Sequence, residues 1–125
     1  MVYAVDFDGT LSLGHYPEIG APNLPLFDFL RREQYKGGKV ILWTCRSGRL
    51  LKEAVAFCNS RDLHFDAINE NLPENIKKYG GDARKVNADY YIDDKTLCFP
   101  GVDFTYWKPD GEELDGEEIL SWPNE

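Results

Sequence analysis

Residues 2–10 read VYAVDFDGT, a short apolar run that ends in acidic residues, glycine and threonine. A nearly continuous apolar run without alternation is typical of a strand buried on both faces of a parallel sheet. We therefore expect a strand over Val2 to Phe7. Open parallel sheets bind ligands beyond the carboxyl ends of their strands. The polar residues that end this run therefore lie where a functional site is expected.

Helical and strand patterns alternate along the rest of the chain. Apolar residues recur at helical spacing over residues 26–35 and 49–60. Further strands are expected at 40–43, 65–68 and 90–92, an edge strand at 104–107, and short helical pieces at Lys77 and at 83–86. Such alternation predicts an α/β fold, a three-layer, Rossmann-like domain with a mostly parallel central sheet.

Charge is unevenly distributed along the 125 residues. The chain has 22 acidic and 14 basic residues, a formal net charge of −8. Seven of the acidic residues, and no lysine or arginine, fall in residues 110–125, so residues 1–109 are nearly balanced. We expect one domain over 1–109 and an acidic C-terminal tail over 110–125. The absence of a basic track argues against binding along nucleic acid, although a phosphorylated polynucleotide end stays open as a substrate.

Cellular location is suggested by what the sequence lacks. No apolar stretch is long enough to cross a membrane, and the N-terminus has no basic region of the kind that begins a signal peptide. The three cysteines form no Cys-x-x-Cys pair, which argues against a disulfide scaffold or a structural zinc site. We expect a cytoplasmic protein without a membrane partner.

Acidic residues follow two of the expected strands. Asp6 and Asp8 lie at the carboxyl end of the first strand, and Asp93 and Asp94 come directly after the strand at 90–92. Side chains two residues apart on an extended backbone point the same way, so Asp6 and Asp8 can share one site. Carboxylates that converge repel one another unless a cation lies among them. Oxygen ligands favour Mg²⁺, which keeps waters and takes substrate phosphate oxygens. This pattern predicts phosphoryl chemistry.

The same segments resemble the haloacid dehalogenase (HAD) superfamily of phosphohydrolases. Its first motif, an apolar strand followed by Asp-x-Asp-Gly-Thr, is matched by VYAVDFDGTL, and its second by ILWTCRSG, which contains Thr44. The acidic fourth motif is matched by YYIDDK, and Lys85 is the best match to the lysine of the third, with Lys77 and Lys78 as rivals. The chain looks most like small bacterial and phage members.

The resemblance implies a role for each matched residue. Asp6 would be the nucleophile that forms an aspartyl-phosphate, and Asp8 the acid and base. Thr44 would hold the phosphoryl oxygens, and Lys85 would offset negative charge. Mg²⁺ would be bound by Asp6, by the backbone carbonyl of Asp8, and by Asp93 or Asp94. Residues 1–109 would then form a HAD-like catalytic domain.

The intervals between these motifs are too short for the specificity cap that the superfamily carries. A flap at residues 12–23 would be the available cover, with His15 and Tyr16 as candidate substrate contacts. The expected substrate is a small-molecule or macromolecular phosphomonoester at an open site, which a second copy of the chain could close. Two alternatives stay open. One is a catalytically silent module that binds metal or phosphate, and the other is a phosphotransferase on the same scaffold.

Overall fold

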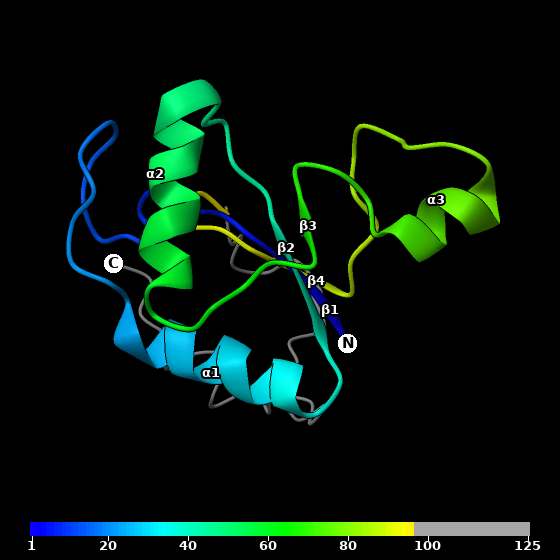
Figure 1. The fold of residues 1–125 in the computed structure, drawn as a ribbon, viewed down its shortest axis with the longest axis horizontal. Coiled ribbons are helices and arrows are strands. Elements are labelled where there is room, and N and C mark those ends of the chain that lie inside the picture. Colours follow the sequence, from blue (N-terminus) through cyan, green and yellow to red (C-terminus); the bar gives the residue numbers. More distant parts are fainter. Residues whose placement is uncertain (97–125) are drawn as a thin grey trace, which may run out of the picture. The chain divides into compact units, whose positions relative to one another are not determined.

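The computed structural model describes residues 1–96, and Met1–Asp94 form one compact unit. The elements in chain order are β1 (Val2–Val5), α1 (Leu24–Tyr35), β2 (Lys39–Leu42), α2 (Gly48–Asn59), β3 (Ala67–Ile68), α3 (Pro73–Tyr79) and β4 (Tyr90–Ile92) (Figure 1). The expected edge strand at 104–107 and the acidic tail at 110–125 lie outside the described residues. None of the helices within residues 1–96 has the length and apolar character that a membrane span requires.

Within residues 1–96 the four strands form a parallel sheet with the order β3-β2-β1-β4. β1 lies between β2 and β4, in register from Tyr3 opposite Val40 and Tyr90 to Val5 opposite Leu42 and Ile92. A parallel sheet with helical crossovers is the α/β, Rossmann-like arrangement that the sequence predicted. The carboxyl ends of the two central strands and of β4 therefore meet at one edge.

Alternate residues of the strands build two apolar layers. One face carries Tyr3, Val5, Val40 and Leu42, and it packs against residues of α1 and α2: Phe27, Leu30, Ala54 and Cys58. The other face carries Ala4 and Ile41, which pack against Leu72 and Val86 from the segments on either side of α3. Every one of these side chains is almost fully buried, as a strand covered on both faces requires.

Helix α1 begins two residues before the expected start because Asn23 caps it. The Asn23 side chain accepts a hydrogen bond from the Leu26 amide, and Pro25 occupies the first turn, where no amide donor is needed. The helix ends before Gly37, whose φ of +97° suits glycine. Tyr3 ties it to the sheet, since the phenol hydroxyl donates to the Glu33 carboxylate at 2.7 Å.

Three details of the sequence-based prediction are wrong. β1 ends at Val5 rather than Phe7, because the chain turns there: the amides of Thr10 and Ser12 both donate to the Phe7 carbonyl. Residues 83–86 form no helix. Instead the buried Asn71 side chain donates to the Ala83 carbonyl and accepts from the Asn87 amide, which holds this segment as a loop. The third concerns burial: strands of a parallel sheet are typically covered on both faces, but Tyr91 of β4 is 43% exposed.

Candidate metal and phosphate site

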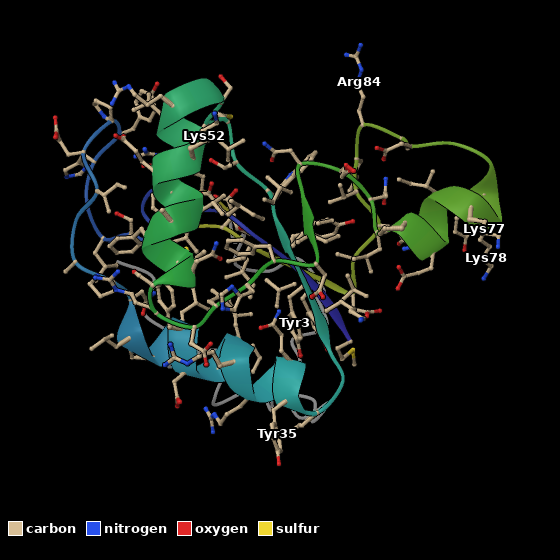
Figure 2. All side chains as sticks on the ribbon, in the orientation of Figure 1. Tyr3, Tyr35, Lys52, Lys77, Lys78 and Arg84 are labelled. Atoms are coloured by element: carbon tan, nitrogen blue, oxygen red, sulfur yellow. The ribbon has the colours of Figure 1, made fainter. Side chains whose placement is uncertain are left out.

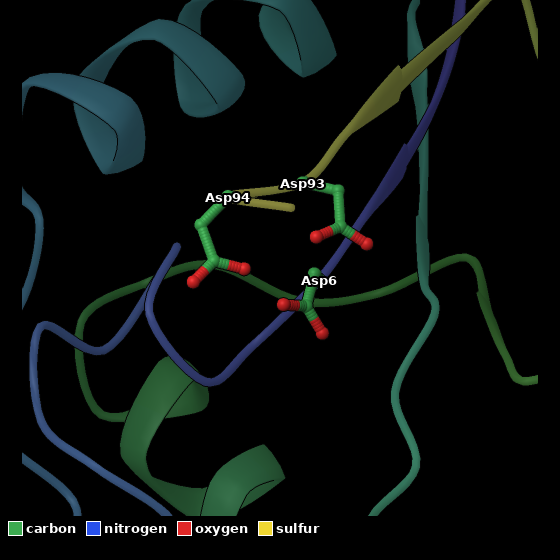
Figure 3. A group of neighbouring side chains, drawn as sticks. All are labelled: Asp6, Asp93 and Asp94. Carbon is green, nitrogen blue, oxygen red and sulfur yellow. The ribbon is translucent and has the colours of Figure 1, made fainter. Parts of the chain in front are cut away.

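Three carboxylates converge at the carboxyl edge of the sheet. Asp6 follows β1, and Asp93 and Asp94 follow β4 (Figure 3). One ligand atom from each lies within 4.8 Å of the others. This juxtaposition follows from the topology, because parallel β1 and β4 are neighbours and end at the same level, with the Asp6 amide donating to the Ile92 carbonyl at 2.9 Å.

The environment of Asp6 disfavours its negative charge. Partial burial raises the pKa of this carboxyl to about 6, and the charges of Asp93 and Asp94 contribute in the same direction. Hydrogen bonds from the Phe7 backbone and the Thr10 hydroxyl oppose the rise, the latter at 3.4 Å. A carboxylate that is partly desolvated beside two others is the electrostatic setting that a cation would relieve.

The donor set fits a hard divalent cation. Each of the three side chains offers carboxylate oxygens, the donors that Mg²⁺ prefers. Opposite ligands around Mg²⁺ lie about 4.2 Å apart, twice the usual metal–oxygen distance of about 2.1 Å. The oxygens of the group lie within 4.8 Å of one another, so a small rotation of the exposed Asp93 and Asp94 side chains would bring them to the separation that Mg²⁺ requires.

Gly9 makes room for the third carboxylate. Its φ of +79° belongs to the left-handed region, and a Cβ at this position would lie 2.2 Å from Oδ2 of Asp94. Asp94 therefore reaches the site across the bare backbone of the turn that follows β1. Two local features therefore require glycine at position 9: the turn needs a positive φ, and the Asp94 carboxylate occupies the space that a Cβ would fill.

A pocket of about 310 Å³ opens beside this group. Its lining residues come from the ends of β1, β2, β3 and β4: Asp6, Trp43, Thr44, Cys45, Asn69 and Asp93. The structure thus brings together Asp6, Thr44 and Asp93, three of the residues selected from the sequence. The Thr44 Oγ1 atom accepts a hydrogen bond from the Arg46 amide at 3.1 Å. That bond leaves the hydroxyl hydrogen available for an acceptor in the pocket.

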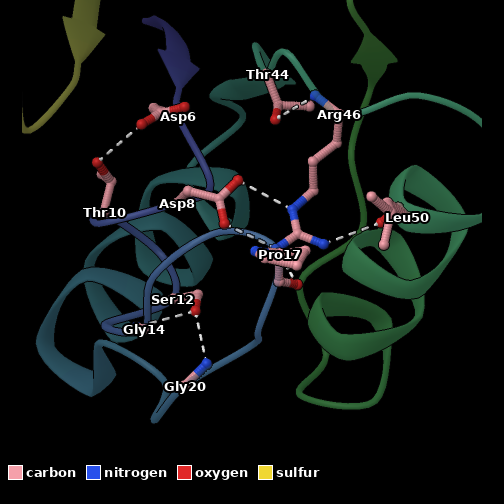
Figure 4. Close-up of polar contacts among 10 residues, drawn as sticks. All are labelled: Asp6, Asp8, Thr10, Ser12, Gly14, Pro17, Gly20, Thr44, Arg46 and Leu50. Carbon is pink, nitrogen blue, oxygen red and sulfur yellow. Dashed lines mark hydrogen bonds and ion pairs between the residues drawn. The ribbon is translucent and has the colours of Figure 1, made fainter.

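Asp8 is turned away from the acidic group and is held by Arg46. Its two carboxylate oxygens accept from Nε and Nη2 of Arg46 at 2.9 and 2.7 Å (Figure 4). Asp8 does not contribute its carboxylate to the three-residue group. The expectation that Asp6 and Asp8 point the same way assumed an extended backbone, and the chain has already left β1 and entered a turn at this point.

The structure places the lysine candidates apart from the pocket lining. The Lys85 ammonium lies 5.1 Å from the centre of the Tyr91 ring, and Lys85 is exposed. Lys77 and Lys78 are exposed on α3 (Figure 2). The flap candidates also lie outside the lining: His15 is exposed, and the Tyr16 ring packs 5.2 Å from the Arg46 guanidinium carbon.

Two residues of the site were missed in the sequence. Arg46 lies two residues beyond Thr44, and Asn69 follows β3 directly with a φ of +55°. The Asn69 side-chain oxygen accepts from the Thr44 amide at 2.8 Å and so fixes the backbone beside the pocket. The available signal was position alone, since both polar residues follow strands that end at the functional edge of the sheet.

Comparison with known proteins shows a family to which the chain belongs. No known family model matches the chain, and no curated protein is significantly similar to it. Among solved structures, a conserved protein coded by a locus of Bacteroides thetaiotaomicron superposes with a TM-score of 0.68. The two are 41% identical, and the match covers 78% of each chain. The chain belongs to the family of this Bacteroides protein. That protein is named as a conserved protein, so membership of its family assigns no activity.

Proposed function

We propose that this chain is a Mg²⁺-dependent phosphomonoester phosphatase of the HAD type that acts through an aspartyl-phosphate on Asp6. The observation that carries the proposal is the convergence of Asp6, Asp93 and Asp94 within 4.8 Å at the edge of a pocket that also contains Thr44. A carboxylate nucleophile, a group of metal-ligating oxygens and a hydroxyl donor in one pocket are the parts that phosphoryl transfer needs.

Each residue has a task in this reaction. A carboxylate oxygen of Asp6 attacks phosphorus while the bond from phosphorus to the leaving oxygen breaks. The Thr44 hydroxyl donates to a phosphoryl oxygen and orients the group. Asp8, after taking up a proton and giving up one of its two Arg46 contacts, donates that proton to the leaving oxygen and then takes one from the water that hydrolyses the aspartyl-phosphate. Mg²⁺, held by Asp6, the Asp8 carbonyl and Asp93 or Asp94, would neutralise charge on the phosphoryl group and favour ionised Asp6.

The interval lengths support an uncapped site. Within residues 1–96, the segment from 11 to 43 holds the flap, α1 and β2, and the segment from 69 to 89 holds α3 and its loops. Neither contains a further sheet or domain. An open pocket suits a phosphomonoester on a small molecule or on a larger one, and it leaves room for a second copy of the chain to cover it.

A screen with p-nitrophenyl phosphate and a panel of phosphomonoesters, with Mg²⁺ or EDTA, tests the proposal. We expect Mg²⁺-dependent release of phosphate, and we expect Asp6→Asn to lower kcat by roughly 10⁴-fold or more, as loss of a covalent nucleophile does. Asp28→Asn is the matched control, because Asp28 is an exposed aspartate of α1 paired with Arg32. Turnover that survives Asp6→Asn contradicts the proposed nucleophile.

Two observations favour a second candidate, a silent module that binds metal or phosphate without turnover. Lys85, the best sequence match for the third motif, packs over Tyr91, and Asp8 has both oxygens on Arg46. Calorimetry separates the two functions. Tight Mg²⁺ binding that depends on Asp6, together with no turnover of any phosphomonoester, favours the silent module.

A further inference from the structure

Arg46 is the largest fully buried side chain in the described part of the protein, with 2% of the residue exposed. Arginine is rarely buried unless its charge and its donors are matched. Besides the two bonds to Asp8, Nη2 donates to the Pro17 carbonyl at 3.0 Å and Nη1 to the Leu50 carbonyl at 3.3 Å. The hydrogen bonds to Asp8 raise the pKa of Arg46, so the guanidinium group stays protonated.

Two aromatic rings flank the guanidinium group. Its central carbon lies 4.9 Å from the centre of the Phe7 ring and 5.2 Å from that of Tyr16. Arg46 therefore contacts three parts of the chain: the turn after β1 through Phe7 and Asp8, the flap through Tyr16 and Pro17, and the first turn of α2 through Leu50 (Figure 4). Planar stacking and several fixed donors are properties of arginine that lysine does not share.

The flap has its own internal structure, which makes a single anchor at its tip effective. The Ser12 hydroxyl oxygen accepts from the amides of Gly14 and Gly20, and the Leu13 amide donates to the Ala21 carbonyl. Gly14 and Gly20 approach so closely that a Cβ on either would meet the backbone of the other at 2.4–2.5 Å. The neck of the loop is thus closed, and its tip is held by Arg46.

We propose that Arg46 is a positioning residue that fixes the Asp8 carboxylate and the flap tip as one unit. It does not line the pocket itself, so it acts through Asp8 and the flap rather than by touching substrate. We call this attachment of Asp8 and the flap tip to Arg46 the clamp, and its existence depends on the observed contacts and not on any activity. Its consequence for turnover rests on the proposed phosphatase function, in which the Asp8 carboxyl, protonated and freed from one of its two Arg46 contacts, has to reach the leaving oxygen.

Hydrogen exchange of the full chain tests the clamp without any activity. We expect Arg46→Lys to speed exchange of the Leu13 and Glu18 amides at least about tenfold, the equivalent of one charge-assisted hydrogen bond. The amides of β2 should keep their protection. Arg49→Lys is the matched control, since Arg49 is exposed on α2 and paired with Glu53. Unchanged exchange in the flap, or equal acceleration in β2, overturns the clamp.

Kinetics with p-nitrophenyl phosphate and saturating Mg²⁺ test the positioning of Asp8. We expect Arg46→Lys to lower kcat about 100-fold, the scale expected of a misplacement near 1 Å, with KM changed less than about threefold. A kcat within about threefold of the Arg49→Lys value overturns this role. Absence of turnover in the wild-type chain counts against the phosphatase, and the exchange experiment then still decides the clamp.

Tyr16→Ala supplies a second variant in case Arg46→Lys does not fold. Tyr16 is 61% exposed, so its removal leaves the core intact and takes away one of the two rings on the guanidinium group. We expect exchange at Glu18 to rise about threefold, in line with the loss of one cation–π contact. No change at Glu18 in this variant contradicts the clamp.

Discussion

Replacing Asp6 by asparagine is expected to stabilise the metal-free protein at neutral pH while removing its proposed activity. The pKa of this carboxyl is about 6 in the folded chain, chiefly because of partial burial and then because of Asp93 and Asp94. The unfolded value is about 3.9. The folded state therefore binds the Asp6 proton more tightly than the unfolded state, and ionisation above pH 6 costs stability.

The magnitude follows from the shift. Two pKa units correspond to about 3 kcal/mol as an upper limit. Asp6 is only partly buried, so solvent screening reduces the expected gain to about 1–2 kcal/mol. Asparagine keeps one acceptor oxygen for the Phe7 backbone or the Thr10 hydroxyl, so the loss of hydrogen bonding is small. A gain of stability from the loss of a charged side chain is typical of a functional site rather than a structural one.

The upward direction of the Asp6 pKa shift also predicts how the stability of the protein depends on pH. The stability that the protonated carboxyl contributes is fully present below about pH 4 and is lost as the pH rises through 6. Urea unfolding of wild type and Asp6→Asn in EDTA, from pH 4 to pH 8, measures the difference in unfolding free energy. We expect almost no difference near pH 4 and about 1–2 kcal/mol in favour of the variant at pH 7.

Two controls separate this effect from a general effect of charge. Asp28→Asn removes an exposed aspartate from α1 and should change stability by less than about 0.5 kcal/mol at any pH. Mg²⁺ should narrow or reverse the gap at pH 7, because it stabilises the wild type by binding. An Asp6→Asn variant that is equally or less stable than the wild type across the whole pH range refutes the electrostatic reasoning.

Two further outcomes are expected. Gly9→Ala should weaken Mg²⁺ binding about tenfold by calorimetry, because the added Cβ overlaps the Asp94 carboxylate and the φ of +79° is strained for alanine; unchanged affinity would show that Asp94 is not a ligand. In mass-spectrometric mapping of alkylation, exposed Cys45 should react readily, whereas Cys58, whose pKa burial raises to about 12, should react only on unfolding. Equal rates at the two cysteines would contradict the packing of α2.

The sequence predicted the architecture well because the relevant signals are local. Apolar runs bounded by glycine and acidic residues identified β1, β2 and β4, and three- and four-residue spacing identified α1 and α2. The edge at which parallel strands end is then a consequence of topology. For this reason Asp6, Asp93 and Thr44 could be expected at the same edge although they lie far apart in the chain.

The details that failed depend on contacts between distant residues. Nothing near residue 83 indicates that Asn71, twelve positions earlier, holds that segment by side-chain hydrogen bonds. Similarly, the side-chain direction of Asp8 is set by Arg46, 38 positions later. A local pattern can identify a turn after β1, but it cannot show which distant residue a side chain in that turn will contact.

Asp6 and Asp8 lie two residues apart, and the fold treats their charges in opposite ways. Asp8 is matched by a buried arginine from this chain. Asp6 has its charge disfavoured by burial and by the neighbouring carboxylates of Asp93 and Asp94. Three of the four carboxylates lie within 4.8 Å of one another, and the buried guanidinium of Arg46 contacts the fourth. This difference supports the phosphatase proposal, in which Mg²⁺ would bind among the first three carboxylates and Arg46 would position Asp8.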